Sequence, residues 1–319
     1  MRSYLLRRFA LSLITLWLVT VVAFVLLRVA PGDAVLAAMA QAPGEGTLTA
    51  GQIEAQRAAL GLDRSYPVQY VTWTADLLRL DPGASMATGA PVWDETAPRL
   101  AVTIQLALLT IVIIVLVGCV LGVTAARYRG SRIDTAVRSI ALAGLSTPAF
   151  WLGLLVVVAV AAWTGRFIAG AYSPLWDDPW RNLQHVGPAA LVLAVRPAAV
   201  LTRVVRTSTA EALGSEYARA ARARGLSESR LAWMHAFRSA MLPAVTVMGA
   251  QVVFLLGGAV LIEQVFGLPG IGRALVSAVM SRDYTMVQFL VLVFAVVAVV
   301  VNLVIDLLYA RLDPRVRLS

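Results

Sequence analysis

Residues 216–244 read EYARAARARGLSESRLAWMHAFRSAMLPA and lie between two stretches that are apolar enough to cross a bilayer. The segment is rich in alanine and carries Arg219, Arg222, Arg224, Arg230 and Arg238. Charge at this density is costly in hydrocarbon, so the segment is predicted to be a loop outside the membrane. Its position between two apolar runs predicts a membrane span on either side of it.

The composition of the whole chain supports a membrane protein. Of its 319 residues, 59% are hydrophobic and 14% are charged, and the mean hydropathy is +0.78. These values lie well outside the balance of a soluble domain. All 27 basic residues are arginine, which excludes chemistry that needs lysine, including the phosphate-binding lysine of an ATP-binding loop. If ATP drives this protein, another subunit binds the ATP.

The apolar runs predict an all-α membrane protein with six transmembrane helices. A helix needs roughly 20 residues to cross a hydrocarbon core of about 30 Å. The first run follows Arg2, Arg7 and Arg8, but it is too long for the apolar region of a signal peptide, so we expect it to be retained. The predicted spans lie near residues 9–29, 100–126, 139–163, 187–205, 241–263 and 285–308.

The distribution of arginine predicts the orientation of these spans. Positive charge in short loops stays on the cytoplasmic side of a membrane. Arginines gather before the first span, in the loops near 127–138 and 203–238, and after the last span, whereas the other loops hold most of the acids. Both termini are therefore predicted to be cytoplasmic. The same rule explains the net charge of +9, so we expect no nucleic-acid partner.

The first external segment, residues 30–99, is predicted to contain an amphipathic helix on the outer surface. The stretch at 63–83 reads DRSYPVQYVTWTADLLRLDPG, in which Pro67 can start a helix and Asp81-Pro82-Gly83 can end it. The preceding stretch at 40–52, AQAPGEGTLTAGQ, is predicted to be a mobile loop. The apolar residues at helical spacing are Val68, Val71, Ala75 and Leu78.

Several predicted spans contain residues that interrupt a helix. Pro148 lies in the third span, Pro188 and Pro197 lie in the fourth, and GLPGIG at 267–272 separates the fifth from the sixth. Each removes or displaces backbone hydrogen bonds that neighbouring protein or a wet cavity must satisfy. Two interpretations remain open: kinks that improve packing, or a bundle built around a pathway.

The loop at 216–244 is predicted to form two short helices. Ser215 can cap a helix from Glu216 to Arg224 that ends at Gly225, and Ser227 with Glu228 can begin a second helix that leads into the fifth span. In the first helix small residues follow one face, flanked by arginines, which suits insertion into a cleft on another protein. Anionic lipid headgroups or a simple solvated loop are the alternatives. The small residues are Ala218, Ala221 and Gly225.

This segment resembles the cytoplasmic signature loop of ATP-binding-cassette (ABC) importer permeases. The family pattern is Glu-Ala-Ala, three residues, then Gly; here Arg219-Ala220-Ala221 and Gly225 take those places, with Arg219 in place of the glutamate. With this replacement, the segment resembles the dipeptide and oligopeptide branch of the family. Other stretches that resemble this branch are PGD after the first span, LGLDRSYPVQY, STPAFWLGLL, LTRVVRTSTAEAL, IEQVFGLPGIGRALVSAVMSRDY and LYARLDPRVR.

The resemblance implies one permease domain over residues 1–319 with a type I ABC importer-like bundle, in a bacterial or archaeal plasma membrane. It implies a coupling-helix loop at 206–240 that docks on two cytoplasmic ATPase subunits, a second similar permease, and an extracytoplasmic solute-binding protein. ATP and Mg would be bound by the ATPases, so no cofactor is expected on this chain. The coupling residues would be Glu216, Tyr217, Arg219, Ala220, Ala221, Arg222, Arg224, Gly225 and Leu226.

Arg196 is the main candidate for a solute pathway, because it lies near the middle of the fourth span. It is predicted either to face the pathway, where it would attract a peptide carboxylate, or to pair with Asp306 or Glu263 or reach the inner headgroups. No catalytic or metal-binding residues are expected, since the two histidines lie far apart and no cysteine cluster occurs. Further pathway candidates are Ser146, Pro148, Gln251 and Glu263.

The resemblance implies that the transported solutes are di- or oligopeptides. It also implies that membrane lipid surrounds the chain. Relatives of this branch also carry nickel chelates, glutathione or oligosaccharides, so these solutes remain alternatives. A different class of function is a membrane scaffold or sensor that uses the same cytoplasmic loop to hold a partner without transport.

The predicted topology is testable with cysteines introduced at Ser215 and at Thr88. Impermeant thiol reagents should label position 215 only from the cytoplasmic side and position 88 only from the external side, because the arginine-rich loops stay inside. Labelling of both positions from the same side would contradict the arrangement of six spans.

Overall fold

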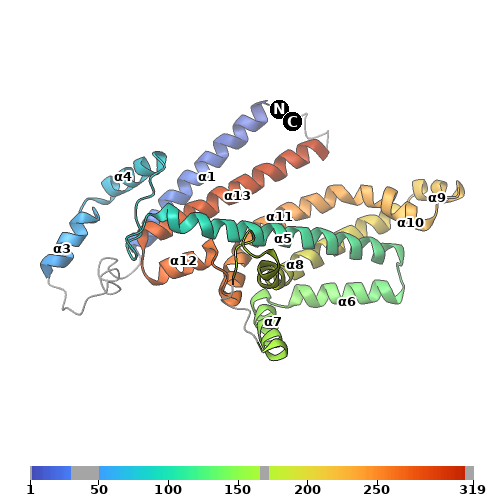
Figure 1. The fold of residues 1–319 in the computed structure, drawn as a ribbon. Helices are drawn as coiled ribbons and strands as arrows, with labels where there is room; N and C mark the ends of the chain where they lie inside the picture. Colours follow the sequence, from blue (N-terminus) through green and yellow to red (C-terminus); the bar gives the residue numbers. More distant parts are fainter. Residues whose placement is uncertain (1, 30–49, 166–171, 313–319) are drawn as a thin grey trace. The chain divides into compact units, whose positions relative to one another are not determined.

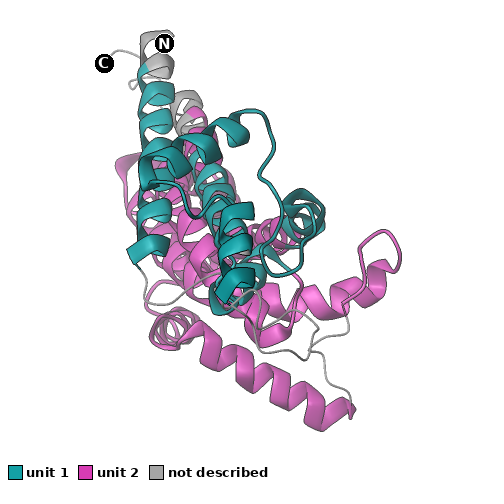
Figure 2. Cartoon of the chain, turned by 90° about the vertical axis from the view of Figure 1, so that its left-hand side faces the viewer, with its two compact units in different colours: residues 1–102, 270–299 teal, residues 103–269, 300–319 magenta. Residues whose placement is uncertain are grey.

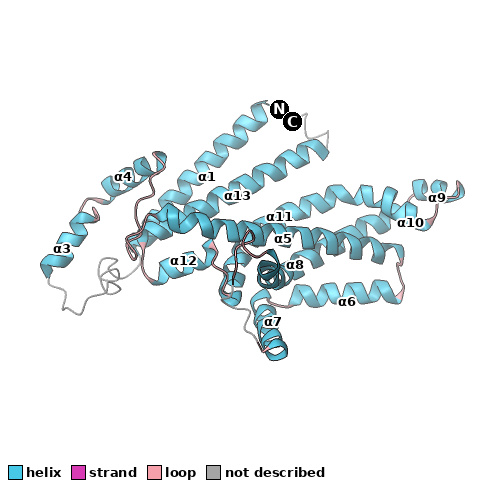
Figure 3. Ribbon diagram, viewed as in Figure 1, coloured by secondary structure: helices cyan, strands magenta, loops and turns pink. Residues whose placement is uncertain are grey.

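The computed structural model describes residues 2–29, 50–165 and 172–312 (Figure 1). Within these ranges the regular structure is helical (Figure 3), apart from one isolated bridge between Ala84 and Pro91. Five helices are long and apolar enough to cross a membrane, and a bent helix pair makes a sixth candidate span. These helices correspond to the six predicted spans.

The long helices extend beyond the predicted spans. Helix α8 begins eight residues before the predicted start of the fourth span, because Asp178 caps its first turn and Pro179 occupies its first position. The spanning helices are α1 (Arg2–Val29), α5 (Val92–Arg127), α6 (Arg132–Ser146), α7 (Ala149–Thr164), α8 (Pro179–Leu213), α11 (Phe237–Phe266) and α13 (Tyr284–Leu312). The shorter helices are α3 (Ala50–Ala59), α4 (Tyr66–Leu78), α9 (Glu216–Ala223), α10 (Glu228–Arg230), the π-helical turn η1 (Leu231–Ala236) and α12 (Ile271–Met280).

The predicted interruptions have different outcomes. The third span is broken: α6 and α7 meet at an angle of 101°, where Thr147 and Pro148 adopt extended conformations. The chain also breaks at 267–272, where Gly267 ends α11 with a φ of 65°. The prediction was wrong for Pro188 and Pro197, because α8 runs continuously through both. Each proline lacks only one backbone donor, and the buried surroundings of this helix keep it intact.

The contacts divide the chain into two compact units, which Figure 2 shows in teal and magenta. Unit 1 comprises residues 1–102 and 270–299, and unit 2 comprises residues 103–269 and 300–319. Helices α5 and α13 contribute residues to both units. Most of the stretch at 40–52, predicted to be a mobile loop, lies outside the described residues, and its last residues begin α3.

In unit 1, α4 confirms the predicted helix in the external segment, and most of its apolar residues at helical spacing do not pack against the protein. Val68, Val71 and Leu78 are exposed, with 48%, 65% and 82% of their surface accessible. The helix packs instead through Tyr70 and Trp73, whose rings lie 5.3 and 6.4 Å from that of Phe24 on α1. Aromatic rings bury more area than valine, so they determine which face turns inward.

Asp283 joins two parts of unit 1 that are far apart in the sequence. Its carboxylate is buried, caps α13 by accepting from the Met286 amide, and accepts hydrogen bonds from the Ser85 hydroxyl and the amides of Met86 and Ala87. A buried carboxylate is stable when donors surround it in this way. The loop around residue 85 is thereby fixed against the start of α13.

In unit 2, α8 is the central helix, and glycines let its neighbours approach closely. A Cβ atom added to Gly118 or Gly122 of α5 would lie 2.7 Å from side-chain atoms of Leu201 or Val205 on α8. The same holds for Gly258 of α11, at 2.9 Å from Leu193. Small residues permit such contacts between membrane helices, where packing drives association.

An ion pair fixes the start of α6 to α8. The Asp134 carboxylate, which is 2% exposed, receives hydrogen bonds of 2.6 and 2.8 Å from Nε and Nη2 of Arg206. It also accepts from the Gly130 amide, and the Ser131 hydroxyl caps the helix. Two parallel bonds make this pair directional, so it sets the register between the two helices.

The close packing of α5 on α8 predicts the effect of adding one methyl group. Gly122→Ala should destabilise the protein by about 1 to 3 kcal/mol, because the new Cβ would overlap the Val205 side chain and the Thr202 carbonyl. The measurement is the thermal unfolding midpoint in detergent micelles. Gly257→Ala is the control, since nothing lies within 4 Å of its added Cβ. Equal stability of the two variants would contradict the packing argument.

Candidate functional site

Serine side chains and one glycine shape the loop after α8, as the sequence predicts. The Ser215 hydroxyl accepts from the Ala218 amide and the Ser227 hydroxyl from the Arg230 amide, so each serine caps a helix. Gly225 has a φ of 84°, which lets the chain turn sharply after α9. The predicted second helix is confirmed as α10 and η1, which continue into α11 through Pro243. Figure 1 shows α9 and α10 at one end of α8 and α11.

The alanine strip of α9 faces the protein itself, which corrects the expectation that it inserts into a partner. Ala218 and Ala221 are 1% and 7% exposed and form a small core with Leu231. Leu213 and Leu226 pack against this core. The small side chains are needed because α9 lies directly on the following turn of its own chain. Any partner must therefore contact another face of α9.

The open face of α9 borders a cavity of about 470 Å³. Tyr217, Ala220 and Arg224 lie at i, i+3 and i+7, so they share this face. Tyr217 and Met234 are each 63% exposed and give the cavity an apolar surface, and Arg224 and Arg230 give it positive charge. The Tyr217 hydroxyl and Nδ1 of His235 are 3.0 Å apart, which fixes the tyrosine ring beside η1. This geometry suits a partner that presents apolar and acidic side chains.

The other charged residues of α9 make local ion pairs. Arg219 lies 3.2 Å from Glu216, and both side chains are highly exposed. Nε of Arg222 donates to Glu228 over 2.6 Å, which raises the pKa of the Arg222 guanidinium. Exposed pairs contribute little to stability. They orient the side chains of Arg219 and Arg222 instead. Arg224 is therefore the arginine of this helix region that lies on the open face of α9.

The structure places Arg196 on the open side of α8. Its side chain is exposed and forms no ion pair with any side chain that the structure describes. Of the two predicted carboxylate partners, Glu263 is fully buried and accepts a hydrogen bond of 2.6 Å from the Thr103 hydroxyl. The side chain of Asp306 lies outside the described residues. The described contacts therefore do not support the pairing of Arg196 with Glu263.

The remaining pathway candidates do not gather around Arg196. Ser146, at the end of α6, is exposed and donates to the Leu142 carbonyl, and Pro148 is exposed at the start of α7. Gln251 is half-buried on α11. Glu263 is enclosed in the same helix, so a solute cannot reach it in this arrangement. The break beside Ser146 and Pro148 is confirmed, whereas a role for these residues in a pathway stays a prediction.

Arg196 belongs to a polar strip on α8 that the sequence analysis did not recognise. Arg203, Thr207 and Glu211 follow at i+7, i+11 and i+15 and are also exposed, whereas much of the rest of the helix is buried. Arg203 and Thr207 line a groove of about 330 Å³. The periodic spacing of these polar residues along the sequence indicates such a strip. We call Arg196, Arg203, Thr207 and Glu211 the α8 polar strip.

Family models account for nearly the whole chain. Residues 118–318 match the family described as binding-protein-dependent transport system inner membrane component. Residues 1–107 match the N-terminal region of the membrane component of such systems. The two matches meet within α5, so the external segment and the helical bundle both have counterparts in the family.

Individual relatives match over almost their full length. A protein of Brucella abortus (strain 2308), provisionally named a peptide transport system permease, is 39% identical over 318 residues, with 99% of each chain covered. The dipeptide transport system permease protein DppB of Escherichia coli (strain K12) is 36% identical over 340 residues, again with 99% of each chain covered.

A solved structure has a similar fold. The inward-facing MetNI methionine ABC transporter matches with a TM-score of 0.51 and 19% identity, over 70% of this chain and 94% of that chain. At this identity the likeness concerns the fold alone. The sequence matches over the full length are what assign the family: the chain belongs to the inner membrane components of binding-protein-dependent transport systems, and it is a multi-pass ABC permease subunit.

Proposed function

We propose that this permease carries di- or oligopeptides inward, in a transporter that separate cytoplasmic ATPase subunits drive. The names of the Brucella and Escherichia relatives, both assigned to peptide or dipeptide transport, support this solute class. An extracytoplasmic binding protein would deliver the solute, and a second similar permease would complete the path. ATP and Mg would stay on the ATPase subunits.

The α8 polar strip is the observation that carries the proposal. Arg196 lies near the middle of the predicted fourth span and is costly against lipid, so its side of α8 needs a protein or water surface. The rest of the strip continues that side toward the predicted cytoplasmic loop. Much of the rest of α8 is buried in unit 2, and the strip is an exposed polar side where a second subunit and a wet path can lie. A cation on this path attracts the carboxylate of a peptide, and its open setting keeps the contact weak enough for release.

The open face of α9 supports coupling to an ATPase. Tyr217 and Met234 offer an apolar surface, and Arg224 adds charge without an ion pair among the described side chains. Because α9 is anchored by its alanines on the following turn, a force on this face passes directly to η1 and α11. Movement of the ATPases would in this way shift the spanning helices between discrete packings.

Transport in proteoliposomes tests the proposal. The permease, its partner permease and the ATPases should be co-purified, and uptake of labelled di- and oligopeptides should require ATP and the solute-loaded binding protein. Uptake of a nickel chelate, glutathione or an oligosaccharide without peptide uptake would reassign the solute. Co-purification with a partner but no uptake of any of these solutes would favour a scaffold or sensor.

Gly225 tests the coupling role of the loop. Gly225→Asp should insert normally but lose ATP-driven uptake, because an aspartate strains a backbone held at a φ of 84° and adds negative charge beside Arg224. The added Cβ would meet nothing within 4 Å, so crowding inside this chain is not the cause. The readouts are uptake and the amount of ATPase that co-purifies.

Gly225→Asn is the matched comparison, since asparagine and aspartate are both enriched at positive φ and differ in charge. It should retain more uptake than Gly225→Asp. Full uptake by the aspartate variant would show that this turn is not part of the coupling element.

Arg196 tests the pathway role of the α8 polar strip. Arg196→Ala should lower peptide uptake while the complex assembles normally, and Arg196→Lys should keep part of the activity because it keeps the charge. Arg132→Ala is a control, as this arginine is exposed at the start of α6. Normal uptake by Arg196→Ala, or failure of the complex to assemble, would refute a pathway role and favour a structural one.

A further inference from the structure

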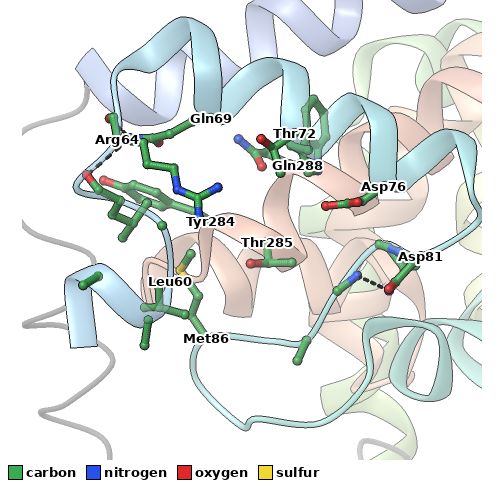
Figure 4. A pocket seen from close by; sticks show the side chains of 18 of the residues that line it. Leu60, Arg64, Gln69, Thr72, Asp76, Asp81, Met86, Tyr284, Thr285 and Gln288 are labelled. Carbon is green, nitrogen blue, oxygen red and sulfur yellow. Dashed lines mark hydrogen bonds between the residues drawn. The ribbon is translucent and has the colours of Figure 1, made fainter. Parts of the chain in front are cut away.

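Unit 1 contains a pocket of about 400 Å³ whose lining includes no residue of the α8 polar strip. Its wall comes from the end of α1, the end of α3 with the turn at 60–64, one face of α4, the loop at 81–86 and the start of α13. Gln69, Thr72, Trp73 and Asp76 of α4 lie at helical spacing and all line it. Figure 4 shows Gln69 and Tyr284 at one end of the pocket, Asp76 and Asp81 at the other, and Thr285 between them.

A half-buried arginine lines this pocket without a carboxylate partner. Nε and Nη2 of Arg28 donate to the side-chain oxygen of Gln69 over 3.3 and 3.0 Å, and its guanidinium carbon lies 3.5 Å from the centre of the Phe24 ring. Among the side chains that the structure describes, its hydrogen bonds reach only uncharged acceptors. A half-buried cation of this kind is stabilised by an anion placed beside it.

Two buried donors on the same wall also lack a partner. Gln288 is 3% exposed, yet its side-chain nitrogen makes no hydrogen bond, and the same is true of the indole nitrogen of Trp73. Nearly all buried polar groups in proteins have a hydrogen-bond partner. With Arg28, these groups form a set of donors without an anionic acceptor.

The opposite end of the pocket is acidic. One oxygen of Asp81 accepts from the Gly83 amide, and Asp76 makes only a long contact of 3.8 Å with the exposed Arg79. Both carboxylates can accept further hydrogen bonds. The pocket thus offers donors and positive charge on one part of its wall and carboxylates on another.

The groups that form the wall are held in place. The side-chain nitrogen of Gln69 donates to the carbonyls of Arg64 and Leu62 over 2.8 and 3.3 Å, so its oxygen is directed to Arg28. Asp283 fixes the loop near Met86 to the start of α13, next to Tyr284. Fixing these parts of the wall lowers the entropy that is lost when a ligand binds.

We propose that this pocket binds a short peptide in its zwitterionic form. The terminal carboxylate would accept hydrogen bonds from Arg28 and, after the side chains of Gln288 and Trp73 rotate toward it, from their buried nitrogens. The terminal ammonium would donate to Asp76 and Asp81. A volume of about 400 Å³ lies within the range of small-molecule sites. The identity of the ligand rests on the proposed peptide transport, but the site itself is separate from the α8 polar strip and lies on the predicted external side.

Binding to the full permease in lipid nanodiscs, without binding protein or ATP, tests this site. The probe is alanyl-alanine, titrated by calorimetry beside its C-terminal amide, its N-acetyl derivative and inorganic phosphate. The free dipeptide should bind, and both blocked forms should bind about tenfold more weakly, because each loses one charged contact. Phosphate should not compete at concentrations that match the dipeptide.

Substitutions in the wall should have the corresponding effects. Arg28→Met and Gln288→Leu should each weaken the free dipeptide about tenfold while leaving the amide nearly unchanged. Asp76→Asn with Asp81→Asn should weaken the dipeptide but not its N-acetyl form. Arg181→Met and Asp177→Asn are matched controls, because both residues are exposed on the same predicted side and neither lines the pocket.

The inference is wrong if the free dipeptide does not bind, if the blocked forms bind as tightly, or if the Arg28 and Gln288 variants bind like the controls. Phosphate that displaces the dipeptide at equal concentration would show a general anion site and would also overturn it. Uptake of peptides by the complete transporter is measured in parallel. Peptide uptake without binding at this pocket would refute the site and leave the proposed function intact.

Discussion

The close approach of helices to α8 is the constraint on which unit 2 depends. Gly118 and Gly122 of α5 and Gly258 of α11 leave no room for a side chain where they meet it. In a membrane the lipid is as apolar as the helices, so contact of backbones at short range supplies the packing energy that burial supplies in water. With much of its surface enclosed in this way, α8 contains two prolines without a break, and its polar strip stays exposed.

Packing contacts also fix the loop that follows α8. Helix α9 rests on Leu231 through Ala218 and Ala221, and the Arg206–Asp134 pair holds the last part of α8 against α6. The loop therefore has its own core and does not depend on a partner for its shape. Its open face, with Tyr217 and Arg224, is available for docking, and the proposed coupling needs only small movements of a preformed element.

Unit 1 follows a different physical principle, because polar contacts organise it. Asp283 ties the loop near residue 85 to α13, and Gln69 ties α4 to Arg28 at the end of α1. On the wall of the same pocket the side-chain nitrogens of Gln288 and Trp73 have no acceptor among the described residues.

The sequence alone determined the apolar spans, the caps at Ser215 and Ser227 and the turn at Gly225, because hydropathy, capping and positive φ depend on neighbouring residues. Its motifs also indicated the family. It could not determine which face of a helix turns inward: α4 buries Tyr70 and Trp73 rather than Val68, and α9 buries its alanines. Those choices, like the grouping of Arg28 with Gln288, depend on which distant segments pack together, and only the tertiary structure decides that.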